Sequence, residues 1–178
     1  MSYSPLYLKV IAQVLRPDIE GGYSNDPDDS GGETNYGISD TSDGQRDHMA
    51  DLDGDGRPDV AIINMTRDDA VLAFHTRYWK KMKLEEITDQ EAVLQIFDFG
   101  VNAGPGTAIK LAQKIAGATR DGAMGPVTTA LINKYPGNFL AQYKQGRKDF
   151  YMDLAVRIPK NRKYLLGWLA RVDKIHLT

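Results

Sequence analysis

Residues 19–39 read IEGGYSNDPDDSGGETNYGIS and decide what kind of fold the chain forms. The carboxylate of Glu20 ends an apolar periodic segment and is followed at once by two glycines. Glycines let a backbone turn sharply and pass close to a ligand, so this junction has the character of a binding loop. Further carboxylates crowd the same loop, at Asp26, Asp28, Asp29 and Glu33. Crowding favours the protonated form of the most buried carboxyl, and paired carboxyls with separated pKa values are what cleavage of a glycosidic bond requires.

The same stretch resembles the signature of glycoside hydrolase family 108, whose members are lysozyme-like N-acetylmuramidases found largely as phage and prophage endolysins. The tetrapeptide Glu-Gly-Gly-Tyr at 20–23 matches without a gap. The further matching positions are Asn25, Asp26, Pro27, Asp29, Gly31, Gly32, Thr34, Gly37 and Ile38. Such a dense match is far more specific than a lone glycine motif. The resemblance implies that Glu20 is the catalytic acid.

The group that acts on the other face of the sugar stays open at the level of sequence. Asp29 fits the role of a base or of a charge that stabilises an oxocarbenium ion, with Thr34 positioning a water molecule. Glu33 is the rival for this role, and a mechanism with a single acid is a further alternative. Tyr23 suits either local packing or stacking on a sugar. Asn102 is a candidate substrate ligand, because an amide meets an acetamido group with both a donor and an acceptor.

Residues 40–65 depart from the family pattern and contain the sequence DLDGDGRPD at 51–59. Carboxylates that recur at every second position before a glycine turn are the spacing of EF-hand and dockerin calcium loops. The predicted ligands are Asp51, Asp53, Asp55, the carbonyl of Arg57, and Asp59. The twelfth position of the loop is Ile62, not Glu, so the last ligand is expected from Asp47, Asp68, Asp69 or water. We predict a structural Ca²⁺ here, and no cofactor for catalysis.

Most of the remaining chain has the periodicity of helices, with apolar residues recurring at three and four positions. The predicted helices cover about residues 5–20, 67–82, 106–116, 126–134, 138–157 and 162–174, and a capping box at 88–91 opens another. Pro17 is expected to kink or break the first helix. Glycine, proline, asparagine and aspartate dominate residues 21–39, which predicts a loop with at most a short strand at 35–39. The predicted class is all-α, or α+β at most: a lysozyme-like helical fold with a small β-ribbon near the cleft.

The second half of the chain carries the string DGAMGPVT at 121–128. It resembles the turn of small peptidoglycan-binding helical modules, in which glycines allow positive φ and a proline starts the next helix. We therefore predict a catalytic region at 1–98 and a peptidoglycan-binding-like region at 99–178. No linker rich in glycine, serine or proline separates them, which favours one shared core.

The composition of the chain limits the classes of molecule that it is expected to bind. The chain has 178 residues, a formal net charge of −2 and no cysteine, so it offers no general basic field for nucleic acid and no thiol chemistry. The N-terminus lacks the pattern of a signal peptide, and no stretch approaches the length of a membrane span. We expect a monomer. The resemblance to phage endolysins implies that it stays in the host bacterial cytoplasm until release onto the periplasmic wall, with a possible holin as the partner that gives access to the wall.

The resemblance to glycoside hydrolase family 108 implies a bacteriolytic endolysin that hydrolyses the β-1,4 bond between N-acetylmuramic acid and N-acetylglucosamine, and the loop carboxylates agree with this chemistry. A lytic transglycosylase is one alternative, because it also relies on one acidic glutamate. A non-catalytic, calcium-dependent wall-binding protein is the other.

Overall fold

The computed structural model describes residues 2–19, 22–25 and 32–178. The chain divides into two compact units, Met1–Lys81 and Met82–Thr178. The described residues are mostly helical, with two small two-stranded sheets, and this confirms the predicted fold class. None of the helices in the described part of the chain combines the length and the apolar character that crossing a bilayer requires.

Helix α1 (Pro5–Val14) begins as the sequence predicts, with Ser4 as N-cap and Pro5 in the first turn. The Ser4 hydroxyl accepts a hydrogen bond from the backbone N–H of Tyr7 at 3.1 Å. The helix ends at Val14, so the predicted extent to residue 20 is wrong. Proline has no N–H to donate, and its ring disfavours helical geometry in the residue before it. The helix therefore ends ahead of Pro17.

Helix α2 (Arg67–Phe74) opens with the predicted capping box and packs against α1 within the first unit. The Asp69 N–H donates to the Thr66 hydroxyl, and the Thr66 N–H donates to the Asp69 carboxylate. The helix continues through a π-helical turn, η3 (His75–Trp79), into the short α3 (Lys80–Met82). Tyr7 is fully buried, donates its hydroxyl hydrogen to the Val71 carbonyl, and lies 5.1 Å from the Trp79 ring. This aromatic contact joins α1 to the helical run.

Two short hairpins make up the described strands of the first unit. Strands β1 (Thr34–Asn35) and β2 (Ile38–Ser39) pair antiparallel, so the stretch predicted to hold at most one short strand at 35–39 is instead a tight hairpin. Tyr36 and Gly37 both have positive φ, the geometry that two-residue hairpin turns prefer. Strands β3 (Met49–Ala50) and β4 (Val60–Ala61) also pair antiparallel. They close the base of the acidic loop at 51–59.

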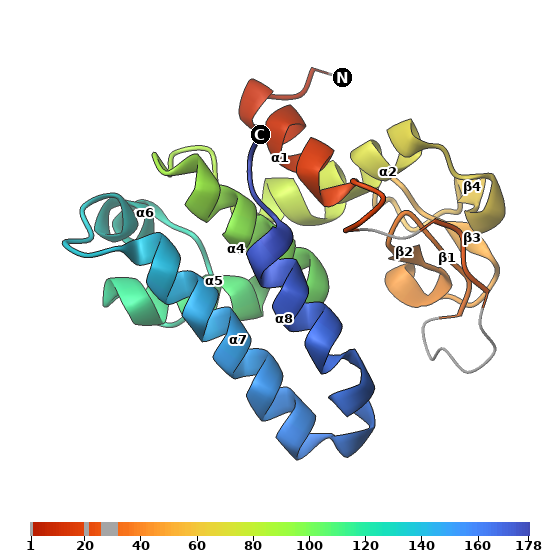
Figure 1. Cartoon of the computed structure of the whole chain (residues 1–178). Coiled ribbons are helices and arrows are strands. Elements are labelled where there is room, and N and C mark those ends of the chain that lie inside the picture. The colour runs from red at the N-terminus through yellow and green to blue at the C-terminus, as the bar shows by residue number, and fades with distance from the viewer. Residues whose placement is uncertain (1, 20–21, 26–31) are drawn as a thin grey trace. The chain divides into compact units, whose positions relative to one another are not determined.

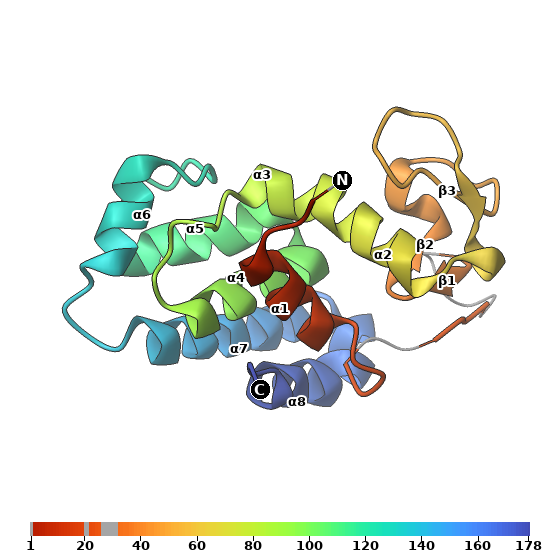
Figure 2. The same ribbon diagram turned by 90° about the horizontal axis from the view of Figure 1, so that it is seen from above.

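The second unit is a helical bundle whose elements agree with the predicted helices to within a few residues. They are α4 (Gln90–Ala103), α5 (Pro105–Ala116), α6 (Pro126–Asn133), α7 (Phe139–Arg157), η4 (Pro159–Tyr164) and α8 (Leu165–Lys174). Helices α7 and α8 lie side by side in both Figure 1 and Figure 2. Every residue of α4 from Ala92 to Gly100 is buried, so this helix is the core of the unit. The predicted boundary between residues 98 and 99 falls inside α4.

A buried ionic cluster joins three helices of this bundle. The Asp98 carboxylate on α4 accepts hydrogen bonds from Arg147 on α7 at 2.5 Å and from Arg171 on α8 at 2.7 Å. Asp98 and Arg147 have no solvent exposure. Burial raises the pKa of Asp98, but the charges of Arg171 and Arg147 outweigh burial and hold that pKa below its usual range. Asp98 is therefore a structural anion.

Candidate active site

The predicted acid Glu20 and its candidate partner Asp29 lie outside the described residues. The segments that flank them are described. Ser24 and Thr34 form an isolated antiparallel bridge in which each backbone N–H donates to the other's carbonyl at 2.8 Å. This bridge adjoins the β1–β2 pairing, because Thr34 belongs to β1. Ser24 is therefore held against the hairpin that carries Thr34.

Thr34, the predicted water-positioning residue, lies on β1 and is half-buried. Its hydroxyl donates to the Gly32 carbonyl at 3.3 Å. With its hydrogen engaged in this way, the oxygen keeps its lone pairs for a donor such as water.

Glu33, the rival for the second role, is buried, with 6% of its surface exposed. Its Oε2 lies 2.9 Å from His48 Nδ1. The Tyr23 side chain is exposed, and its hydroxyl lies within hydrogen-bonding reach of the same carboxylate, which raises the pKa of the phenol. The structure thus brings two of the predicted residues, Tyr23 and Glu33, into one hydrogen-bonded group.

His48 is a member of this group that sequence reasoning missed. Its backbone adopts the left-handed region at φ 63°, and its N–H donates to the buried carboxylate of Asp40 at 2.7 Å. The hydrogen bond to Glu33, reinforced by the negative charge of Asp40, raises the pKa of His48. The histidine is 15 positions from Glu33 in sequence. No local spacing rule connects two residues that a positive-φ turn brings together.

Asn102 lies on α4, in the second unit, and is exposed. Its Nδ2 donates to the Asp98 carbonyl one helical turn earlier, at 2.9 Å. The side-chain nitrogen is therefore engaged by its own helix. A role in binding substrate stays a prediction.

The acidic loop has the internal geometry of a cation-binding loop. Carboxylate oxygens of Asp51, Asp53 and Asp59 all lie within 4.8 Å of one another. The Asp51 carboxylate accepts hydrogen bonds from the backbone N–H groups of Gly54 at 2.6 Å and Gly56 at 3.0 Å. Both glycines have positive φ, which the sharp turn requires. Three of the predicted ligands therefore converge.

Two other residues considered as ligands, Asp55 and Asp69, do not belong to this cluster. Asp55 lies outside the cluster of three and accepts a hydrogen bond from the Arg57 N–H at 2.8 Å. Asp69, one of the residues considered for the missing twelfth ligand, is engaged in the capping box of α2.

Arg77 places a compensating positive charge near this loop. Burial raises the pKa of Asp51, but the N–H groups of Gly56 and Gly54 and the charge of Arg77 outweigh burial and lower that pKa. Asp51 is therefore an anion at neutral pH, as a cation ligand has to be.

The family comparison covers most of the chain. The family described as "Glycosyl hydrolase 108" matches residues 13–104, and the one described as "Predicted Peptidoglycan domain" matches residues 107–173. The chain belongs to glycosyl hydrolase family 108. The family 108 match includes the Glu-Gly-Gly-Tyr stretch, the β1–β2 hairpin, the acidic loop and α4. The chain is accordingly a glycoside hydrolase that acts on peptidoglycan.

A solved structure shows the same architecture as this family 108 chain. "Structure of Brucella abortus SagA" matches with a TM-score of 0.72 and 24% sequence identity, covering 95% of this chain and 90% of that chain. At this identity the likeness shows the fold. No curated protein matches the sequence.

Proposed function

We propose that this peptidoglycan hydrolase is a muramidase of the endolysin type, which cleaves the β-1,4 bond between N-acetylmuramic acid and N-acetylglucosamine. The observation that carries the proposal is the family 108 match over residues 13–104, which contains the Glu-Gly-Gly-Tyr stretch. Glu20 is the general acid that protonates the leaving oxygen as the glycosidic bond breaks. Release onto the wall through the opening made by a holin belongs to the same proposal.

The second catalytic role goes to Asp29 with Thr34. Asp29 bears the negative charge that the oxocarbenium ion requires, and Thr34 places the water whose oxygen bonds to C1. Glu33 is assigned to substrate binding together with Tyr23, because its buried carboxylate is already bonded to His48. A carboxylate held in this way serves better as a fixed acceptor for a sugar hydroxyl than as a group that exchanges protons.

The test compares the reducing ends released from purified sacculi by the wild-type chain, three site variants and one control variant. Glu20→Gln and Asp29→Asn should each lower the rate by about a hundredfold or more, the usual contribution of a proton-transferring carboxyl. Glu33→Gln should act mainly through a raised KM. Glu86→Gln, an exposed carboxylate of the second unit, is the matched control and should retain full activity.

The products decide between hydrolysis and transglycosylation. A hydrolase adds the elements of water across the broken bond, whereas a lytic transglycosylase closes an anhydro ring, so mass analysis of the released glycan separates the two. Full activity of Glu20→Gln would remove the proposed acid. A larger loss of kcat in Glu33→Gln than in Asp29→Asn would transfer the second role to Glu33.

A structural Ca²⁺ in the acidic loop is a second proposal. Three converging carboxylates, two glycine turns and the hard oxygen donors of the loop fit this ion. The ion would brace the β3–β4 hairpin and take no part in proton transfer.

A further inference from the structure

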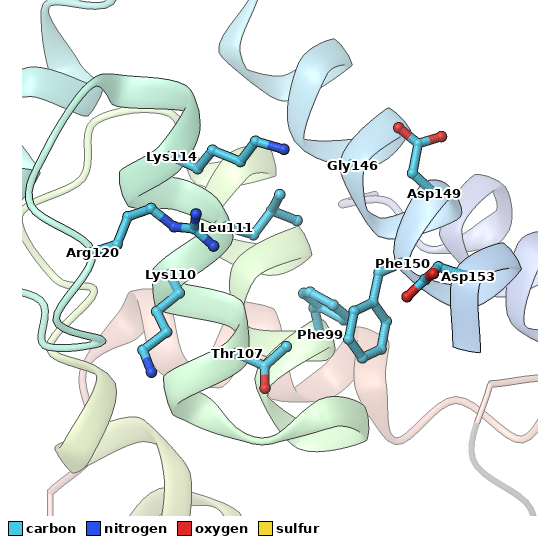
Figure 3. A pocket seen from close by; sticks show the side chains of 10 residues that line it. All are labelled: Phe99, Thr107, Lys110, Leu111, Lys114, Arg120, Gly146, Asp149, Phe150 and Asp153. Atoms are coloured by element: carbon cyan, nitrogen blue, oxygen red, sulfur yellow. The ribbon is translucent and has the colours of Figure 1, made fainter. Parts of the chain in front are cut away.

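The second unit contains a cavity of about 460 Å³ between α5 and α7 (Figure 3). This volume is typical of sites that bind small molecules. Its apolar part is formed by Phe99, Leu111 and Phe150. The rings of Phe99 and Phe150 meet edge to face at 5.1 Å, and Phe99 is fully buried. Phe99 therefore supports the Phe150 ring from within the core, and Phe150 provides the aromatic surface of the cavity.

The absence of a side chain at Gly146 helps to keep the cavity open. Gly146 lines it from α7, and a Cβ at this position would lie 2.7 Å from Leu111 Cδ1. Any larger residue would push Leu111 aside or fill the space between the helices. The cavity thus depends on a specific residue of α7.

Opposite charges line the two sides of the cavity. Lys110 and Lys114 extend from α5, and Arg120 lies in the segment that follows it. Asp149 and Asp153 lie on α7, one helical turn apart. In Figure 3 the Lys114 side chain extends toward α7.

These opposite charges do not neutralise one another. Within the described residues, the three cations make no hydrogen bond and no ion pair. Among the residues that the structure describes, the two carboxylates have partners on their own helix only: Asp149 accepts from Gln145, and Asp153 pairs with Arg157. The cavity therefore presents separate positive and negative sides to a ligand.

We propose that this cavity binds the stem peptide of peptidoglycan. The inference rests on the proposed function, because it assumes that the wall is the substrate. The glycan strand is made of uncharged N-acetylated sugars, since the lactyl carboxyl is consumed in the amide bond to the peptide. The stem peptide carries free carboxylates and, where its third residue is a diamino acid, an ammonium group.

Each charged group of such a peptide has a complementary side of the cavity. Its carboxylates meet Lys114 and Arg120 in charge-assisted hydrogen bonds, and its ammonium group meets Asp149. The methyl groups of its alanines lie against Leu111 and Phe150, which are partly exposed. The match of residues 107–173 to a peptidoglycan domain, which includes all five charged residues, agrees with this assignment.

Calorimetric titration of the full-length chain with a synthetic tetrapeptide stem that contains a diamino acid tests the proposal. Substitution of Lys114→Gln or Asp149→Asn should each weaken peptide binding by about tenfold, the usual effect of removing a hydrogen bond to a charged group. Lys134→Gln and Glu86→Gln remove exposed charges elsewhere in the same unit and should leave it unchanged. A peptide with amidated carboxylates and an acetylated amine should not bind.

The proposal is overturned if the charged peptide does not bind, if the cavity variants bind it as well as the wild type, or if the blocked peptide binds equally. A parallel assay on peptide-free glycan strands separates this outcome from failure of the proposed function. Release of reducing ends without peptide binding removes only the stem-peptide site. Peptide binding without any glycan release removes only the muramidase assignment.

Discussion

At the residue scale, the group formed by Glu33, His48 and Tyr23 has the clearest chemical consequence. Glu33 is buried, and its carboxylate contacts the ring of His48. This contact raises the pKa of His48. Histidine is the side chain whose ordinary pKa lies nearest to physiological pH. The strength of the pair therefore depends on whether the His48 ring is protonated.

The sign of this pH dependence follows from the direction of the shift. A raised pKa in the folded state means that the folded protein gains stability from the protonated ring. This gain is complete below the ordinary histidine pKa of about 6.5 and is lost as the pH rises through the raised value. His48→Asn, which suits the left-handed backbone, should lower the melting temperature more at about pH 5.5 than at about pH 9.

Thermal melts at the two pH values check this expectation. The matched control is His176→Asn, because the His176 ring lies against a backbone carbonyl and not a carboxylate. Equal losses at both pH values in His48→Asn would show that the His48 ring contributes only packing. A greater loss at the higher pH would contradict the assigned charge state.

The same residues show where sequence reasoning stops. Tyr23 was a site candidate because it belongs to the dense family signature, and Glu33 because it is one of the carboxylates of the same stretch. His48 was not found, since its contact depends on a positive-φ turn and on Asp40 holding its backbone. The spacing of residues in sequence predicts which side chains of one loop lie together. It does not predict a contact such as that of Glu33 with His48, which belongs to a later part of the chain.

At the element scale, the acidic loop shows the opposite case. Its alternation of carboxylates and glycines predicted that Asp51, Asp53 and Asp59 converge, because they lie within one hairpin, but it also predicted Asp55, which lies outside their cluster. Helix periodicity likewise predicted the helices of the second unit. The predicted end of α1 was wrong because the prediction extended the helix past Pro17. The spacing of Lys110 and Lys114, and of Asp149 and Asp153, places each pair on one helix face. That these two faces meet across a cavity requires the tertiary packing of α5 on α7.

The calcium proposal belongs to this scale, since the ion would brace one hairpin. Removing Ca²⁺ with a chelator should lower the melting temperature by about 5–10 °C, relative to a calcium concentration about a hundredfold above Kd. The substitution Asp53→Ala should abolish this response. Differential scanning calorimetry with and without chelator measures it, and Mg²⁺ serves as the control ion because it demands a stricter octahedral geometry. A chelator that leaves the wild-type transition unchanged would remove the site.

At the scale of the whole molecule, net charge and local charge make opposite predictions about how salt changes binding to the wall. The chain has 22 basic and 24 acidic residues, so its overall field does not attract an anionic polymer. The stem-peptide cavity instead concentrates unpaired cations on one side. If the cavity provides the attraction, salt should weaken binding, whereas if overall repulsion limits binding, salt should strengthen it.

Sedimentation of the Glu20→Gln variant with sacculi distinguishes these cases, because a variant that cannot cleave leaves the wall intact. We expect the bound fraction to fall between about 0.1 M and about 1 M salt, where the screening length drops from about 10 Å to about 3 Å. Adding Lys114→Gln should lower the bound fraction at the lower salt and flatten this dependence, and adding Lys134→Gln should not. Binding that rises with salt would mean that attraction to the wall comes from uncharged contacts, and the cavity would lose its role in recruiting the enzyme.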